Sequence, residues 1–218
     1  MVKNQKWTFL YALIITILVF NFGIFMGYML ESNRIDEIKD WSFEAEMQIL
    51  DQRIQRDAFD VVGLDCEIMI QENINFADRI FEEAQKISRY EDANRIGSEI
   101  RSQHKKYDLL RTLFWVNSIR IKQQCNSDYH NLVYFYKYND PDLSQKAEQR
   151  FFSKLLGDVK ERYGSNVMLI PIAGDNDLLS IELLMNKYNI DELPTILIDE
   201  DIKLTEVESF EDIEKYIN

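Results

Sequence analysis

The chain has 218 residues, of which 46% are hydrophobic and 29% are charged, and its formal net charge is -13. This composition is typical of a folded chain with room for one medium domain and accessory elements, or for two small domains, and it excludes a largely disordered one. The negative charge repels phosphate backbones and anionic lipid headgroups, so nucleic acid is a poor candidate partner.

The first predicted element is a membrane-spanning helix. The segment Trp7–Leu30, WTFLYALIITILVFNFGIFMGYML, contains no charged residue, and at about 1.5 Å per residue it reaches roughly 36 Å, enough to cross a hydrocarbon core of about 30 Å. A cleaved signal peptide is the alternative, but the apolar run exceeds the usual 7 to 15 residues or so and no small-x-small cleavage site follows it. We therefore predict an uncleaved signal anchor over residues 7–30 after a tail at residues 1–6.

Charges and glycines around this helix suggest its orientation and its neighbours. Lys3 and Lys6 precede it, and no excess of Lys and Arg follows it. This bias predicts a single-pass protein of the cell membrane with a cytoplasmic N-terminus and an extracytoplasmic C-terminal domain. Gly23 and Gly27 form a Gly-x-x-x-Gly spacing that lets two membrane helices approach closely, so a homo-oligomer is one interpretation and an ordinary anchor is the other.

A stalk helix is predicted over residues 31–62 and a helical hairpin over residues 63–126. Apolar residues recur there at steps of three and four, which indicates one packed face on each helix. The three stripes are Phe43, Met47, Leu50, Ile54, Ala58 and Val61; Ile70, Ile74, Ala77, Phe81, Ala84 and Ile87; and Leu109, Leu113, Val116 and Ile119. We expect a stalk helix or coiled-coil arm, then two antiparallel helices joined by a turn that includes Gly97.

The two cysteines frame this hairpin. Cys66 lies where its first helix begins and Cys125 where its second helix ends, so an antiparallel pair would bring them together. In an extracytoplasmic domain the even number of cysteines allows a Cys66–Cys125 disulfide. The alternative is a pair of unbonded buried thiols, which the reversed membrane orientation would favour.

The last part of the chain, residues 127–218, alternates between strand and helix patterns. Strands are predicted at residues 132–138, 166–172, 192–199 and 202–208, and helices at residues 141–163, 177–190 and 209–217. Asp177 is a candidate cap for the second helix, and Ser209 with Asp212 resembles a capping box for the third. The order β-α-β-α-β-β-α predicts a parallel pair joined by a crossover, a closing hairpin and a last helix packed on the sheet.

This order resembles a known family. The strand-turn-helix sequence YFYKYNDPDL and the tripeptide Leu193-Pro194-Thr195 before an apolar strand are similar to a minimal thioredoxin fold, over about Asn131–Asn218. The whole layout is similar to archaeal membrane-anchored proteins that have a helical hairpin ahead of such a domain. The resemblance implies an α/β thioredoxin-like domain preceded by a transmembrane helix and an α-helical hairpin.

The resemblance also locates a degenerate active-site turn. Thioredoxin-like proteins carry Cys-x-x-Cys after the first of these strands, where the helix N-terminus stabilises a thiolate. The matching residues here are Asp140, Pro141, Asp142 and Leu143, so both cysteines are lost. We expect Asp140 to cap the helix and Pro141 to take its first position. A nucleophilic or basic carboxylate is the alternative, but the sequence identifies no His, Lys or oxyanion donor beside it.

The resemblance assigns Leu193, Pro194 and Thr195 to the cis-proline loop of the family, which lies beside that turn. An extended peptide bound there would pair with backbone groups, whereas a folding role without a ligand is the alternative. The sequence has no phosphate-binding glycine motif, and His104 and His130 with the two cysteines lack zinc-ligand spacing. We therefore expect no catalytic residue, metal or cofactor.

Three functions follow as hypotheses. The first is a membrane-anchored, extracytoplasmic protein that presents a redox-inactive thioredoxin-like domain to a protein or peptide. The second is a thiol-disulfide oxidoreductase that uses Cys66 and Cys125. The third is a structural subunit of a membrane assembly that oligomerises through Gly23, Gly27 and the stalk helix.

Overall fold

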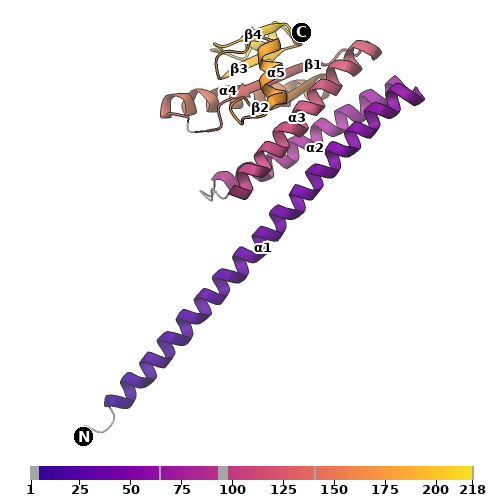
Figure 1. The fold of residues 1–218 in the computed structure, drawn as a ribbon. Coiled ribbons are helices and arrows are strands. Elements are labelled where there is room, and N and C mark those ends of the chain that lie inside the picture. Colours follow the sequence, from indigo (N-terminus) through magenta and orange to yellow (C-terminus); the bar gives the residue numbers. More distant parts are fainter. Residues whose placement is uncertain (1–4, 64, 93–97, 140, 218) are drawn as a thin grey trace. The chain divides into compact units, whose positions relative to one another are not determined.

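The structure is a computed structural model that describes residues 5–63, 65–92, 98–139 and 141–217 (Figure 1). Side chains are described for residues 7–30, 43–59, 63, 65–82, 101–139 and 141–217. The chain forms two compact units, Met1–Phe43 and Glu44–Asn218, and each is treated by itself. The turn predicted around Gly97 lies outside the described residues.

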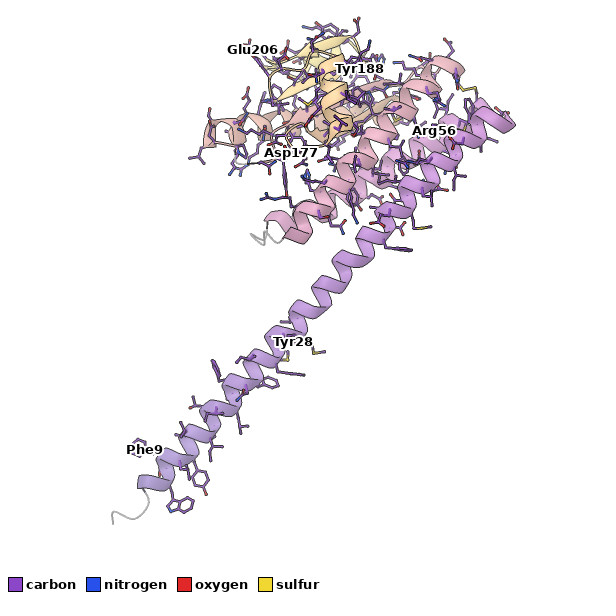
Figure 2. The ribbon with its side chains drawn as sticks, in the orientation of Figure 1. Phe9, Tyr28, Arg56, Asp177, Tyr188 and Glu206 are labelled. Carbon is purple, nitrogen blue, oxygen red and sulfur yellow. A yellow bond between two sulfur atoms is a disulfide. The ribbon has the colours of Figure 1, made fainter. Side chains whose placement is uncertain are left out.

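The N-terminal unit is helical and apolar. Helix α1, Gln5–Val62, contains the segment Trp7–Leu30, which is long and apolar enough to cross a membrane and has a mean hydropathy of 2.4. The large apolar side chains of this segment are exposed, and those of Phe9 and Tyr28 can be seen projecting from the helix (Figure 2). The predicted membrane and stalk segments are one helix, because no Gly or Pro interrupts residues 28–62. The helix ends at Val62, and the following Gly63 has a φ of 71°, a conformation that favours glycine.

The second unit contains the end of α1, where the described part of the predicted stripe does not pack in the core of this unit. Among the described residues of that stripe in this unit, Met47, Leu50 and Ile54 are 48%, 52% and 58% exposed. The packed side of α1 instead carries Ala45 and Ile49, which contact the main core. A small residue such as Ala45 lets two helices approach closely. The face of α1 that contacts the core is therefore set by side-chain size and is not its most apolar face.

A helical hairpin follows, made of α2, Cys66–Asp92, and α3, Ser98–Cys125, which lie side by side (Figure 1). In α2 the predicted stripe is correct for Ile70, Ile74 and Ala77, which pack in the core, while the side chains of Ala84 and Ile87 lie outside those described. In α3 the predicted stripe is correct only for Ile119, which packs against the core, whereas Val116 is 38% exposed. The residues that α3 buries most fully among its hydrophobic ones are Tyr107, Leu110, Phe114, Trp115 and Ile121. Helix α3 is covered by α2 on one side and by the sheet on another. A single apolar stripe in the sequence therefore does not identify either buried face.

The remaining elements form a small α/β arrangement. They are β1 His130–Tyr136, α4 Leu143–Tyr163, the short 3-10 helix η1 Gly164–Asn166, β2 Val167–Ala173, α5 Leu179–Lys187, β3 Thr195–Ile198, β4 Ile202–Leu204 and α6 Glu211–Glu214. The sheet order is β2-β1-β3-β4, with β1 and β2 parallel and the other neighbours antiparallel. The predicted order of strands and helices is confirmed. The cap predicted for α5 was wrong, because Leu178 is its N-cap and Asp177 has a φ of 52°.

Both faces of the sheet are covered by helices. Val133 and Phe135 of β1 point into a core shared with the hairpin and α5, whereas Leu132 and Tyr134 point into a second core with α4 and α6. Alternation along a strand produces this division, and each fully buried side chain of this size contributes about 1.5–3 kcal/mol. Tyr188, labelled in Figure 2, closes the first core just after α5, with its ring centroid 5.4 Å from that of Trp115.

Candidate functional site

The start of α4 is capped by a different aspartate from the one predicted. Asp142 is the N-cap, and its Oδ1 accepts a hydrogen bond from the Gln145 amide at 2.8 Å. Pro141 therefore precedes the cap rather than taking the first helical position, and Asp140 lies outside the described residues. The next residue, Leu143, begins the helix and is 86% exposed. In the described part of the matching turn, one carboxylate is occupied in capping and one apolar side chain faces solvent.

The two residues before Asp140 are bonded to Asp175. The amides of Tyr138 and Asn139 donate to the two carboxylate oxygens of Asp175 at 2.7 and 2.8 Å, and the Asn139 side chain donates to the Asp175 carbonyl at 2.8 Å. Asp175 follows β2, so it ties the end of β1 to the end of β2. This attachment fixes the chain just before the turn, and α4 begins after it with Asp142 as its N-cap.

The predicted proline loop lies beside the start of α4. The Leu193-Pro194 peptide bond is cis, and the Gln145 side-chain amide donates to the Leu193 carbonyl at 3.1 Å. Thr195 is buried, and its hydroxyl donates to the Glu192 carbonyl at 2.6 Å. A shallow polar hollow of about 360 Å³ lies there. Its lining residues are Glu148, Glu192, Leu193, Pro194, Thr205 and Glu206, the last of which is labelled in Figure 2.

The two cysteines are paired at a distance from this surface. Cys66 and Cys125 form a disulfide with their Cα atoms 5.5 Å apart. Cys125 lies before β1 begins and Asp142 lies after it ends, so the two are separated by the length of a seven-residue strand, about 20 Å. The structure therefore brings the turn and the proline loop together and leaves the cysteines elsewhere.

A buried polar cluster on α3 was missed by the sequence analysis. Asp108 is fully buried, and its Oδ2 lies 3.0 Å from His104 Nδ1 and accepts from Asn176 Nδ2 at 2.5 Å. Its Oδ1 accepts from Arg111 and from the Ala173 amide, both at 3.3 Å. Four donors around one carboxylate compensate for its removal from water.

This cluster reaches the end of β1. With the Nδ1 proton of His104 directed at Asp108, Nε2 accepts from the Tyr136 hydroxyl at 2.9 Å. The His104 ring also stacks on Tyr138, with ring centroids 3.8 Å apart. A histidine therefore does lie near the turn, although the sequence suggested none. The available signal was the spacing of His104, Asp108 and Arg111 at i, i+4 and i+7, which places all three on one side of a helix.

The turn between β3 and β4 is held by a second set of carboxylates. Asp199 accepts from Lys122 at 2.6 Å and from the Asn131 amide at 2.9 Å, and Glu200 accepts from Trp115 Nε1 at 2.6 Å. Burial acts to raise the pKa of Asp199, but Lys122, the Asn131 amide and His130 together hold that pKa below its usual value. Burial raises the pKa of Glu200 above its usual value, despite the hydrogen bond from Trp115.

We expect Glu200→Gln to stabilise the domain increasingly as pH rises. Because the folded-state pKa of Glu200 is above its usual 4.5, ionised Glu200 lowers the stability of wild type as pH rises through 4.5 and on through that raised value. Glutamine does not ionise and keeps an oxygen acceptor for Trp115. Urea unfolding should show a larger free energy of unfolding for the variant, relative to wild type, at pH 7 than at pH 4. A difference between the two proteins that does not change with pH would contradict this prediction.

Asp142→Ala should lower the free energy of unfolding by about 1 kcal/mol, because the Gln145 amide loses its acceptor at the start of α4. The matched control is Asp140→Ala, which removes the aspartate predicted from sequence and should change stability much less. Urea unfolding of both variants separates the two caps. A larger loss for Asp140→Ala would place the cap at residue 140.

No model of a known family matches this chain, and a comparison with curated proteins finds no match either. The class of protein therefore comes from the structure: an α/β domain with a small mixed four-stranded sheet, preceded by a helical hairpin and by an apolar helix long enough to cross a membrane. The thioredoxin-like assignment stays a prediction.

Proposed function

We propose that this protein is anchored in the cell membrane by residues 7–30 and presents an extracytoplasmic, redox-inactive thioredoxin-like domain that binds a protein or peptide. The observation that carries the proposal is the start of α4. Where the resembling family has reactive thiols, this chain has a capping Asp142 and an exposed Leu143, beside the loop of Pro194. This arrangement supports contact with a partner and offers no thiol for exchange.

The chemistry of the surface suggests the kind of segment it binds. The hollow beside Pro194 is bordered by three glutamates, Glu148, Glu192 and Glu206. Leu143 adds an apolar contact at the start of α4. An extended segment with a basic side chain flanked by an apolar one complements both features.

Three further observations support the anchor and its orientation. Trp7–Leu30 has the length and hydropathy of a membrane span. Lys3 and Lys6 precede it, which favours a cytoplasmic N-terminus. The Cys66–Cys125 disulfide is of the kind that persists in oxidising compartments.

A binding titration tests the proposal. Full-length protein in nanodiscs would be titrated into fluorescent extended peptides that contain a Lys-Leu pair, with anisotropy as the readout. We expect saturable binding to wild type and at least tenfold weaker binding to Glu192→Lys. Glu182→Lys is the matched control, because Glu182 is an exposed glutamate on α5 and the change in net charge is the same. Equal affinity for the two variants would contradict the proposed surface.

The hypothesis of a thiol-disulfide oxidoreductase is less favoured. It needs Cys66 and Cys125 to react, and they lie at the opposite end of β1 from the proline loop. An insulin-reduction assay of the full-length protein should therefore show no activity. Turnover that is lost on replacing Cys66 would favour the enzyme instead.

The hypothesis of a membrane assembly is favoured by one observation. Met47, Leu50 and Ile54 are exposed on α1 at steps of three and four, the spacing of a coiled-coil seam. If two chains pair there, Leu50→Gln should reduce the dimer fraction seen by mass photometry of the full-length protein. Arg53→Gln, at an exposed position of α1 outside this spacing, is the control, and a monomeric wild type would rule this function out.

A further inference from the structure

A second hollow lies beside α4 and the edge strand β2. It has a volume of about 660 Å³, which is within the range of about 300–1,000 Å³ typical of small-molecule sites. Residues from α2, α3, β1, α4 and β2 border it. This hollow, called the β2 groove below, uses none of the residues assigned to peptide binding above.

The two ends of the β2 groove differ in chemistry. Because α4 is the crossover between parallel strands, it runs antiparallel to β1 and β2. The ends of the strands and the start of α4 therefore meet at one end, which carries Tyr136, Lys146 and Arg150. The other end is bordered by Leu156, Gly157 and Leu169. The groove is thus cationic at one end and apolar at the other.

Its charge is opposite to that of the protein as a whole. The chain carries 38 acidic residues against 25 basic ones, yet the described residues that border the groove include Arg111, Lys146 and Arg150 and no Asp or Glu. Among the described residues, neither Lys146 nor Arg150 forms an ion pair. The local field therefore favours an anion, although the overall charge does not.

Arg111 has an unsatisfied donor beside the groove. It borders the groove, is only 6% exposed, and uses one terminal nitrogen to contact Asp108. Its Nε is buried without an acceptor among the described residues. Buried donors are nearly always hydrogen-bonded, and because this N–H is itself inaccessible, an anion in the groove satisfies it only if the guanidinium turns toward the groove.

The strand edge excludes one class of occupant. Pro171, in the middle of β2, has no N–H to offer, and the Ala173 N–H is already bonded to Asp108. An added peptide strand would find neither donor, and proline is a common device that blocks such pairing. The occupant is therefore not a β-strand.

We propose that the β2 groove binds a long-chain carboxylate, with its head at Arg111, Lys146 and Arg150 and its chain along Leu156, Leu169 and Pro171. A carboxylate matches the planar guanidinium of Arg111, and an alkyl chain matches the apolar end of the groove. This inference does not depend on the peptide site, and either site can fail alone.

Photolabelling of the full-length protein in nanodiscs of zwitterionic lipid tests the proposal. The probe is dodecanoate with a diazirine near the end of its chain, and labelled residues are mapped by mass spectrometry. Labelling within Trp7–Leu30 measures the amount of probe in the bilayer. The labelling of the groove is therefore divided by the labelling of this segment. We expect labels on α4 and β2 near Leu156 and Leu169. The same chain ending in trimethylammonium should label these positions at least tenfold less.

Two variants sharpen the test. Gly157→Leu should abolish groove labelling, because a Cβ at Gly157 meets no atom within 4 Å and a longer side chain there would fill the groove. Lys146→Gln with Arg150→Gln should reduce labelling at least threefold, and these exposed residues can change without loss of the fold. Lys154→Gln, on the same helix but outside the groove, is the control and should have no effect. Equal labelling by both probes, or full labelling of the Lys146/Arg150 variant, would overturn the proposal.

Discussion

Replacing Cys66 and Cys125 together with serine is expected to lower the free energy of unfolding by about 4 kcal/mol. The disulfide closes a loop with a sequence separation of 59 residues, and in the chain-entropy treatment a loop of that length restricts the unfolded chain by about this amount. It also fastens the start of α2 to the end of α3, so the effect should appear in the hairpin and in the sheet packed against it.

Urea unfolding of full-length protein in a mild detergent, followed by near-ultraviolet circular dichroism, measures this loss. Wild type under reducing conditions is the matched comparison, because it loses the same bond without any substitution. Both samples should unfold at a similarly lowered midpoint. An unchanged midpoint in either would show that the pair does not brace the native hairpin.

Asp108→Ala should cost about 3–5 kcal/mol, the usual result of removing one partner from a buried ion pair. Asp108 is completely buried and accepts from Arg111, Asn176 and the Ala173 amide. Without it, the guanidinium of Arg111 stays buried with no anion beside it. The loss should therefore come mainly from the unpaired partners rather than from the missing side-chain volume.

A double-mutant cycle separates these two causes. Arg111→Met in the background of Asp108→Ala should recover part of the loss, since the uncompensated charge is then gone. Asp128→Ala is the control, because Asp128 is an exposed aspartate after α3 and should change stability by less than about 0.5 kcal/mol. Additive effects of Asp108→Ala and Arg111→Met would mean that the two residues do not act as a pair.

The elements that could be predicted are those with a strong local pattern. The uncharged run from Trp7 to Leu30 marks a potential membrane span, and the alternation of strands and helices after residue 127 gives the sheet order expected for a crossover followed by a hairpin. Turn and cap residues predicted the ends of these elements to within a few residues of the ends in the structure. The positions of the two cysteines at the hairpin ends were enough to suggest their proximity.

Helix faces and caps were harder to predict because they depend on tertiary contacts. The stripe of Leu109, Leu113, Val116 and Ile119 was correct only for Ile119, because α3 is covered on several sides and partly through polar residues. Asp108 accepts from the Ala173 amide of β2, and Asn117 donates to Gln52 of α1. Apolar periodicity does not register such a face. The contacts that precede the cap at Asp142 are also non-local, since Tyr138 and Asn139 donate to Asp175, 37 and 36 residues away.

The candidate sites were predictable only in part. The turn and the proline loop were located by the order of elements, but the exposure of Leu143 and the glutamates around Pro194 needed the structure. The β2 groove left no sequence signal, since its cations come from α3 and α4. Only the fold brings Arg111 to the same hollow as Lys146 and Arg150.

The most direct test of the proposed function is site-specific crosslinking in intact native membranes. A photoreactive amino acid would replace Leu143, at the start of α4, and in a matched sample Leu183, which is also exposed but lies on α5. The proposal predicts one discrete adduct from position 143 with an extracytoplasmic protein, lost on Glu192→Lys, and none from position 183. Absence of any adduct at position 143, or the same adducts from both positions, would contradict it.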